Sequence, residues 1–268
     1  MIQLIASRAL EEYKSNIKVM ISFGILFVFL LLFIYFEQFF IVSGTAFFGF
    51  NISVLSIIGL IFSLIYLYFF SFFVSLTVYS VKRDVQHMNF DSYWGSLMRR
   101  ASVKIFAFYF IISVIVYLVF IVGVYAGLTW LSAIISFIIF CLFMYVPQSA
   151  VLDEKSLEES FVESVSFFKQ NIFISAAIII MGAVILFVIM LIEYALDLLL
   201  LPGIIVSFIL VLMVLVPFME QMKSYAFVLK FSLIKQPEVL AAHAKTHFVA
   251  PKKIDAVRLR EKKSGGKI

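Results

Sequence analysis

The sequence predicts an all-α polytopic membrane protein with six transmembrane helices. Of its 268 residues, 64% are hydrophobic and only 14% are charged, whereas soluble domains carry about 25% charged residues. Stretches without a charged residue recur along the chain, each long enough for one or two helices that cross a bilayer. All 21 lysines and arginines fall in four segments, and six crossings place those segments on one side of the membrane.

Six spans follow from the uncharged stretches and from the turn signals inside them. The stretches between Glu37 and Lys82 and between Lys104 and Asp153 are too long for one helix each, and glycines near 43–51 and 126–129 indicate turns. Pro202 fits the first turn of the last helix, where its missing N–H costs nothing. The predicted spans are 19–42, 53–81, 105–125, 129–148, 171–192 and 201–219.

The positive charges also predict the orientation. The basic segments are the N-terminus, 82–104, 155–169 and the chain from 223 onward, and the opposite side carries only acidic residues. The positive-inside rule then places both termini in the cytoplasm of a cell-membrane protein. The first apolar run lacks a cleavage signal, so we expect a retained span. The chain divides into a membrane domain, 1–235, and a basic, partly disordered cytoplasmic tail, 236–268.

The six spans form three hairpins, and a cytoplasmic amphipathic helix is predicted before each of them. Ser156 and Glu159 have the spacing of a capping box at the start of the third such helix. A helix with one apolar face and a charged back lies flat at the lipid headgroups. The apolar faces are Ile2, Ile5, Ala9, Tyr13 and Ile17; then Trp94, Leu97, Met98, Ala101 and Ile105; then Leu157, Phe161, Val165, Phe168 and Ile172.

Two short sequence similarities within the chain suggest that the hairpins are internal repeats, with chance similarity as the alternative. The run 13–17, YKSNI, resembles 168–172, FKQNI. Similar apolar sequences, 135–138 and 206–209, precede Pro147 and Pro217. These prolines would kink or end the fourth and sixth spans and redirect the chain along the membrane surface. The stretch after Pro217 again has amphipathic spacing, at Phe218, Met222, Tyr225, Leu229 and Leu233.

The region from Pro147 to Asn171 resembles a known membrane architecture. A span ending in Pro147 is followed by the acidic turn and helix VLDEKSLEESF, 151–161, and then by FKQN, 168–171. This pattern is similar to the membrane domain of bacterial glycerophosphodiester phosphodiesterases and to uncharacterised six-span bacterial and archaeal families. In that group a separate soluble domain carries the phosphodiesterase chemistry, and that domain is missing here. The resemblance therefore implies architecture without an activity.

Few side chains are candidates for chemistry. No ionisable residue is predicted near the middle of a span, where such groups are costly and usually functional. Glu37, Glu193 and Asp197 form a candidate acidic cluster at the outer face, for a cation or a basic partner, with rim carboxylates in the headgroup zone as the alternative. His243 and His247 have the helical spacing of metal ligands, but they lie beside a lysine without further ligands, so no metal or cofactor is predicted.

The tail carries a basic strip that suits anionic lipid headgroups. No aromatic residues interleave with it, so no specific nucleic-acid partner is predicted. Its members are Lys252, Lys253, Arg258, Arg260, Lys262 and Lys263.

Three functions compete at this point. The sequence favours a non-enzymatic scaffold or accessory subunit, with the lipid bilayer and a membrane protein as partners. The alternative is a transporter or scramblase for a lipid or another apolar or amphiphilic substrate. An enzyme that acts on headgroups through the outer carboxylates ranks last, because two or three acids without a nucleophile or metal motif are weak evidence for a catalytic site.

Overall fold

The computed structural model describes residues 2–17, 21, 23–29, 39–42, 45–48, 56–86 and 94–228. Within these residues, five helical segments are long and apolar enough to cross a membrane. They are Ser63–Val85, Arg100–Tyr125, Thr129–Leu152, Ile172–Leu198 and Gly203–Val228. The chain is therefore a multi-pass, predominantly helical membrane protein, and these segments correspond to the second to sixth predicted spans.

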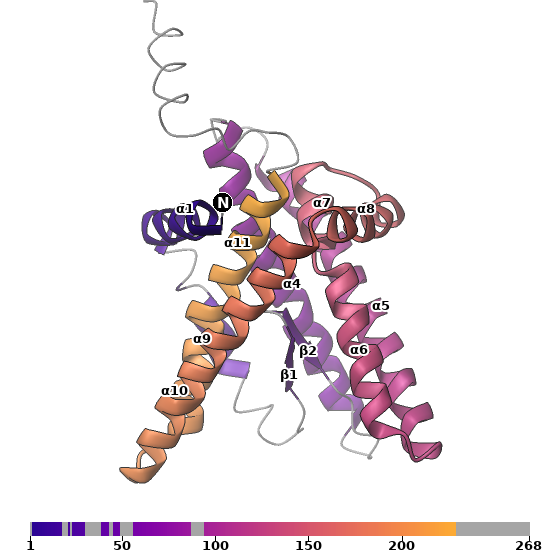
Figure 1. Ribbon diagram of the computed structural model, residues 1–268, viewed down its shortest axis with the longest axis vertical. Helices are drawn as coiled ribbons and strands as arrows, with labels where there is room; N and C mark the ends of the chain where they lie inside the picture. Colours follow the sequence, from indigo (N-terminus) through magenta and orange to yellow (C-terminus); the bar gives the residue numbers. More distant parts are fainter. Residues whose placement is uncertain are drawn as a thin grey trace, which may run out of the picture. The chain divides into compact units, whose positions relative to one another are not determined.

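Two of the five segments are interrupted helices, and Figure 1 shows where α6, α7, α10 and α11 lie. The fourth predicted span consists of α6, Thr129–Phe143, and α7, Val146–Leu152. The sixth consists of α10, Gly203–Leu210, a π-helix η2, Val211–Leu215, and α11, Val216–Val228. The other spans are continuous: α4, Ser56–Gln86; α5, Trp94–Tyr125; and α9, Ile172–Leu198.

The first predicted span differs from its prediction. Phe23–Phe29 is a 3₁₀-helix, η1, and the predicted helix is wrong at Phe39–Val42, which forms strand β1 and pairs antiparallel with β2, Thr45–Phe48. Phe39 lies opposite Phe48 and Val42 opposite Thr45. Aromatic and β-branched residues favour strands, whereas the turn character of Ser43-Gly44 was interpreted as a turn between the first and second spans. The rest of 19–42 lies mostly outside the described residues.

Two amphipathic helices form where the sequence predicts them: α1, Ile2–Ser15, and α8, Leu157–Gln170. In Figure 1 both lie across the long helices, at the end where α7 and α11 are found. The capping box of α8 is confirmed, because Ser156 and Glu159 satisfy one another's backbone N–H groups. The second predicted amphipathic helix is not separate. Residues 94–104 run directly into α5, since no residue between them ends the helix as Asn171 ends α8.

Helix α4 is at the centre of the packing and contacts α5, α7 and α11. Its buried small polar residues include Ser71, Ser75 and Thr77, whose hydroxyls donate to carbonyls one turn back in the same helix. Small residues allow helices to approach closely in a membrane, and the internal bonds satisfy their hydroxyls. The surroundings of α4 and α11 are therefore the most enclosed part of the described bundle, and the polar groups described next lie there.

Candidate functional site: a buried polar cluster in the last span

The last span is interrupted near its middle. Val216 donates its N–H to the carbonyl of Val211, five residues earlier, as a π-helix requires. The next residue, Pro217, has no N–H, so it cannot donate a hydrogen bond to the carbonyl of Met213, four residues earlier. That carbonyl accepts a hydrogen bond from the hydroxyl of Tyr13 in α1, at 2.8 Å. π-Helical turns inside α-helices occur frequently at functional sites.

One turn beyond Pro217 lies an ion pair that is fully buried. Lys223 Nζ is 2.6 Å from Glu220 Oε1, and both side chains have no exposed surface. The other carboxylate oxygen, Oε2, accepts from Gln148 Nε2 of α7 at 2.8 Å. Ser224 donates to the backbone carbonyl of Glu220 at 2.7 Å. The carboxylate thus has a partner on each oxygen, and it ties α11 to α7.

Neighbouring amide groups retain unused hydrogen-bonding capacity. Among the described residues, Gln148 Oε1 and both polar atoms of the Gln221 amide have no hydrogen-bond partner, and both side chains are fully buried. Leaving such groups unpaired costs on the order of 1–3 kcal/mol each, so they usually meet a water or a ligand. We call Gln148, Glu220, Gln221 and Lys223 the polar cluster. Tyr109 of α5 is also fully buried, and its hydroxyl interacts electrostatically with the Glu220 carboxylate.

This site corrects two sequence expectations. The sixth span was predicted to end at Met219, which placed Glu220 and Lys223 at the membrane surface. The helix instead continues through Val228, and nearly all of α11 is buried rather than lying amphipathically along the surface. Ionisable groups therefore occur toward the C-terminal end of the candidate span Gly203–Val228. The available signal was the apolar run Tyr225–Val228 after the charges, together with the three-residue spacing of Glu220 and Lys223.

A second polar group joins α1 to α4 and α11. Tyr225 donates to Asp84 Oδ2 at 2.8 Å, and Arg83 donates to Asn16 Oδ1 at 2.9 Å. Glu12 is buried here and accepts from the side chains of Asn16 and Ser15. Burial, and then the negative charge of Asp84, raise the pKa of the Glu12 carboxyl above its ordinary value.

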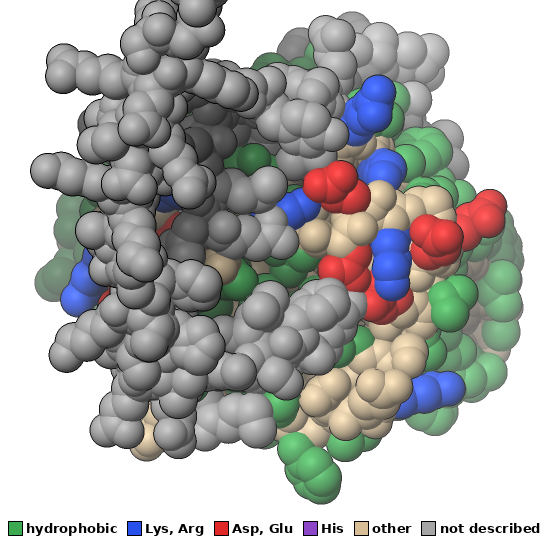
Figure 2. Space-filling view, turned by 90° about the horizontal axis from the view of Figure 1, so that it is seen from above, with side chains coloured by type: hydrophobic (Ala, Val, Ile, Leu, Met, Phe, Trp, Pro, Cys, Tyr) green, Lys and Arg blue, Asp and Glu red, His purple; other side chains and the backbone are tan. Residues whose placement is uncertain are grey.

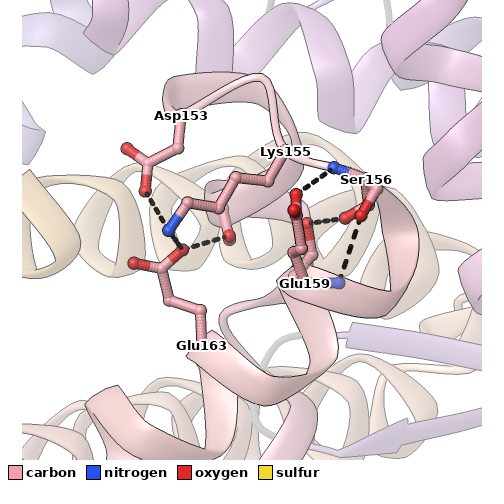
Figure 3. A network of polar contacts seen from close by, with 7 residues as sticks. Asp153, Lys155, Ser156, Glu159 and Glu163 are labelled. Carbon is pink, nitrogen blue, oxygen red and sulfur yellow. Dashed lines mark hydrogen bonds and ion pairs between the residues drawn. The ribbon is translucent and has the colours of Figure 1, made fainter.

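The acidic turn between α7 and α8 forms a third polar group (Figure 3). Lys155 Nζ lies 2.6 Å from Glu163 Oε2 and 3.8 Å from Asp153 Oδ2. The hydrogen bond to Glu163 raises the pKa of Lys155, and hydrogen bonds from Ser156 lower the pKa of Glu159. Figure 2 shows acidic and basic side chains close together on this end of the protein. Most of these charges are paired locally and hold the turn.

Lys82 gives this turn a link to the central helix. Its ammonium lies 2.7 Å from Glu154 Oε1 and donates to the carbonyl of Val151 at 3.1 Å. The side chain of Lys82 is almost completely buried, while Glu154 is half exposed. The turn is therefore fixed to α4.

The predicted outer acidic cluster is only partly described. Glu193 and Asp197 lie in the last two turns of α9, which extends to Leu198. Asp197 Oδ1 accepts from the N–H of Gly203 at 2.9 Å, so this carboxylate holds the turn into α10. A side chain at Gly203 would come within 2.4 Å of the Glu193 carbonyl oxygen, and glycine is required there for the close approach.

The other predicted candidates lie outside the described residues. These are Glu37, His243, His247, and the basic strip Lys252, Lys253, Arg258, Arg260, Lys262 and Lys263, together with the tail 236–268. In the part of the chain that the structure describes, no three His, Cys, Asp or Glu residues are grouped as metal ligands.

The architecture and the polar cluster define a multi-pass α-helical membrane protein with a buried ion pair in an interrupted last span. No family model, no curated protein and no solved structure matches the chain. The resemblance to the membrane domain of glycerophosphodiester phosphodiesterases therefore stays a prediction.

Proposed function

We propose that this chain is a non-enzymatic transport protein that moves an amphiphilic substrate, such as a lipid, across the cell membrane. The polar cluster, placed just after the interruption of the last span, carries this proposal. Interrupted helices at mid-membrane are a recurring way to build substrate sites. Ionisable groups inside a membrane are expensive and are a functional-site hypothesis by default. Unpaired amides beside the ion pair could bind a polar headgroup.

The proposal assumes six crossings with both termini in the cytoplasm. Helix α1 contacts α11 and α4, and Arg83, near the C-terminal end of α4, bonds to Asn16 at the end of α1. Ser56 begins α4 at its other end. A chain that leaves α1 on one side and enters α4 on the other crosses once more between them. η1 packs against α4 and η2, and Phe23 and Leu26 are buried there, which supports this sixth crossing.

The preference for transport over a scaffold rests on one change from the sequence interpretation. A scaffold was favoured while the spans lacked polar groups, because a headgroup then had no polar path. The burial of Glu220 and Lys223 supplies such groups within a span. Because the ion pair neutralises itself, the cluster favours a net-neutral or zwitterionic headgroup.

Reconstitution into liposomes tests the proposal. Vesicles that contain a fluorescent zwitterionic phospholipid in both leaflets are treated with a membrane-impermeant quencher, and the rate at which inner-leaflet probe becomes quenched is measured. We expect protein-dependent loss of the protected fraction, slowed by at least an order of magnitude in Gln221→Leu, which removes the unpaired amide. Lys14→Met, at an exposed position of α1, is the matched control and should behave as the parent does. Background rates for the parent protein would remove the proposal.

A second candidate, an accessory subunit, is supported by the exposed surface of α9. This helix packs mainly against α8, α10, α11 and η2, and large side chains such as Phe173, Phe187 and Tyr194 are more than half exposed. Such a surface accepts either lipid tails or a partner span. Gentle extraction followed by mass spectrometry separates the two, because a stoichiometric second protein supports the subunit, and co-purified lipid alone supports transport.

A further inference from the structure

The interruption in the last span is held by a residue from the other end of the chain. Tyr13 and Met213 are 200 positions apart, and the hydroxyl-to-carbonyl distance is 2.8 Å. Because Pro217 has no N–H to offer Met213, the donor has to come from outside the helix. Gly24 of η1 also lies against Met213, since a Cβ on Gly24 would meet its sulfur at 3.3 Å. The segment that begins the chain therefore encloses this point.

Helix α1 is also linked to the last span on the C-terminal side of the polar cluster. Its buried face, Ile5, Ala9 and Glu12, packs against α11 and α4. Asn16, at its C-terminal end, accepts from Arg83, whose neighbour Asp84 accepts from Tyr225 of α11. Helix α1 thus contacts the last span before Glu220, at Met213, and is linked to it after Glu220, at Tyr225.

Helix α8 repeats this construction on the other interrupted span. Ser164 donates to the carbonyl of Leu142 at 2.8 Å and accepts from the N–H of Tyr145 at 3.1 Å, at the break before Pro147. The buried positions of α8, Ser160, Ser164 and Phe167, have the same spacing as those of α1.

The two helices also end in the same way. Asn16 and Asn171 each direct their backbone N–H and their side-chain amide to the carbonyl four residues earlier. These shared features support the internal repeat suggested by the sequence, and they assign α1 and α8 the same role of bridging a break beside a proline.

The two contacts differ in how well their charges are balanced. Helix α8 is held by the Lys155–Glu163 pair and by the bond between Ser149 and Glu163 at 2.8 Å. Helix α1 instead buries Glu12 near a second carboxylate, Asp84, and among the described residues the Arg83 guanidinium opposes their negative charge. Ser80, Ser15, Asn16 and Tyr225 are further polar groups that face Glu12, and the charge of Arg8 acts on Tyr225. The α1 contact therefore holds an excess of negative charge when Glu12 is ionised, whereas the charges of the α8 contact are paired.

We propose that α1 is a latch on the last span, which encloses the polar cluster when docked and opens it when released. This inference extends the proposed function by naming the regulation of its site. Its pH dependence follows from Glu12, whose pKa is raised when α1 is docked. The docked state therefore binds the proton more tightly. Stabilisation by this group is complete below the ordinary carboxyl pKa and is lost as pH rises through the raised value.

Cysteine accessibility tests the latch without any transport assay. Cys141 is the single cysteine, so Cys141→Ala gives a background in which Ser224→Cys reports on the fully buried α11. In reconstituted protein, the reporter reacts with N-ethylmaleimide only when the region opens. We expect Tyr13→Phe to raise its labelling rate about two- to tenfold, the factor that corresponds to the net free energy that one hydrogen bond contributes to the docked state.

Controls separate latch release from general loosening. Tyr194→Phe, at a residue of α9 that is 65% exposed, should leave the rate unchanged, and Asn16→Ala should raise it as a second release variant. Relative to an accessible Leu200→Cys reference, labelling in the parent should increase as pH rises from the ordinary carboxyl pKa through the raised pKa of Glu12, and it should stay flat in Glu12→Gln. Unchanged labelling in both Tyr13→Phe and Asn16→Ala overturns the latch. Faster labelling without lipid movement keeps the latch and removes the transport function.

Discussion

At the scale of single residues, the Glu220–Lys223 pair decides how the last span is held. Both side chains are fully buried, and Gln148 occupies the second carboxylate oxygen. Removing one partner of a buried pair costs about 3–5 kcal/mol because a charge stays behind without compensation, whereas replacing both is often nearly neutral. The pair should therefore show strong non-additivity on mutation.

We predict that Glu220→Gln and Lys223→Met each destabilise the protein by about 3–5 kcal/mol, and that the double variant recovers most of this loss. Gln at 220 keeps a carbonyl oxygen for Gln148, so the effect measures the charge rather than a cavity. Unfolding in detergent, followed by circular dichroism against denaturant, gives the values. Lys14→Met is the control at an exposed position. Single variants as stable as the parent would show that the pair is not buried in the folded protein.

At the scale of the elements, serine residues allow α8 to pack closely against the fourth span. Ser160 and Ser164 are fully buried, while the apolar stripe predicted from spacing, with Phe161 and Val165, is only half-buried. Phe161 of this stripe packs against the rings of Phe108 in α5 and Phe143 in α6, and the small serines bring α8 close to the backbone of the fourth span. Ser164 in addition bridges the break at Tyr145.

We predict that Ser164→Ala destabilises the protein by about 1–3 kcal/mol, because it leaves the N–H of Tyr145 and the carbonyl of Leu142 without this partner in a buried place. Ser166→Ala, two residues away on the exposed side of the same helix, should change stability by less than about 0.5 kcal/mol. The comparison uses the same substitution in the same helix, so helix propensity cancels. Equal effects at the two positions would contradict the bridging role of Ser164.

Local signals in the sequence were enough for several elements. The capping box predicted the start of α8 at Leu157, and the turn at 126–129 was predicted from Gly127, which adopts a left-handed φ of +68°. The π-helix and the hydrogen bonds around Glu220 were not predictable in this way. They depend on Tyr13 and Gln148, which are remote in sequence and supply hydrogen bonds that the span alone lacks. The polar cluster was missed for the same reason.

At the scale of the whole molecule, the arrangement of the described helices specifies a topology that can be measured. We predict that cysteines placed at Gly127 and Leu200, in a Cys141→Ala background, react with an impermeant maleimide added outside intact cells. Both lie in turns between paired spans. Cysteines at Lys14 and Lys155 should react only after the membrane is permeabilised. The helix α1 and the α7–α8 turn both contact α4 near its C-terminal end, which lies on the side of the membrane opposite to Gly127 and Leu200 in the six-span topology.

The position at Lys14 separates six crossings from five. With five, the N-terminus would lie outside, and a cysteine there would be labelled in intact cells. With six, α1 lies on the same side as α8, because Arg83 bonds to Asn16 and the adjacent Lys82 bonds to the α7–α8 turn at the same end of α4. External labelling at Lys14 would remove the sixth crossing and would also separate α1 from Met213, so the latch depends on this topology as much as on Tyr13.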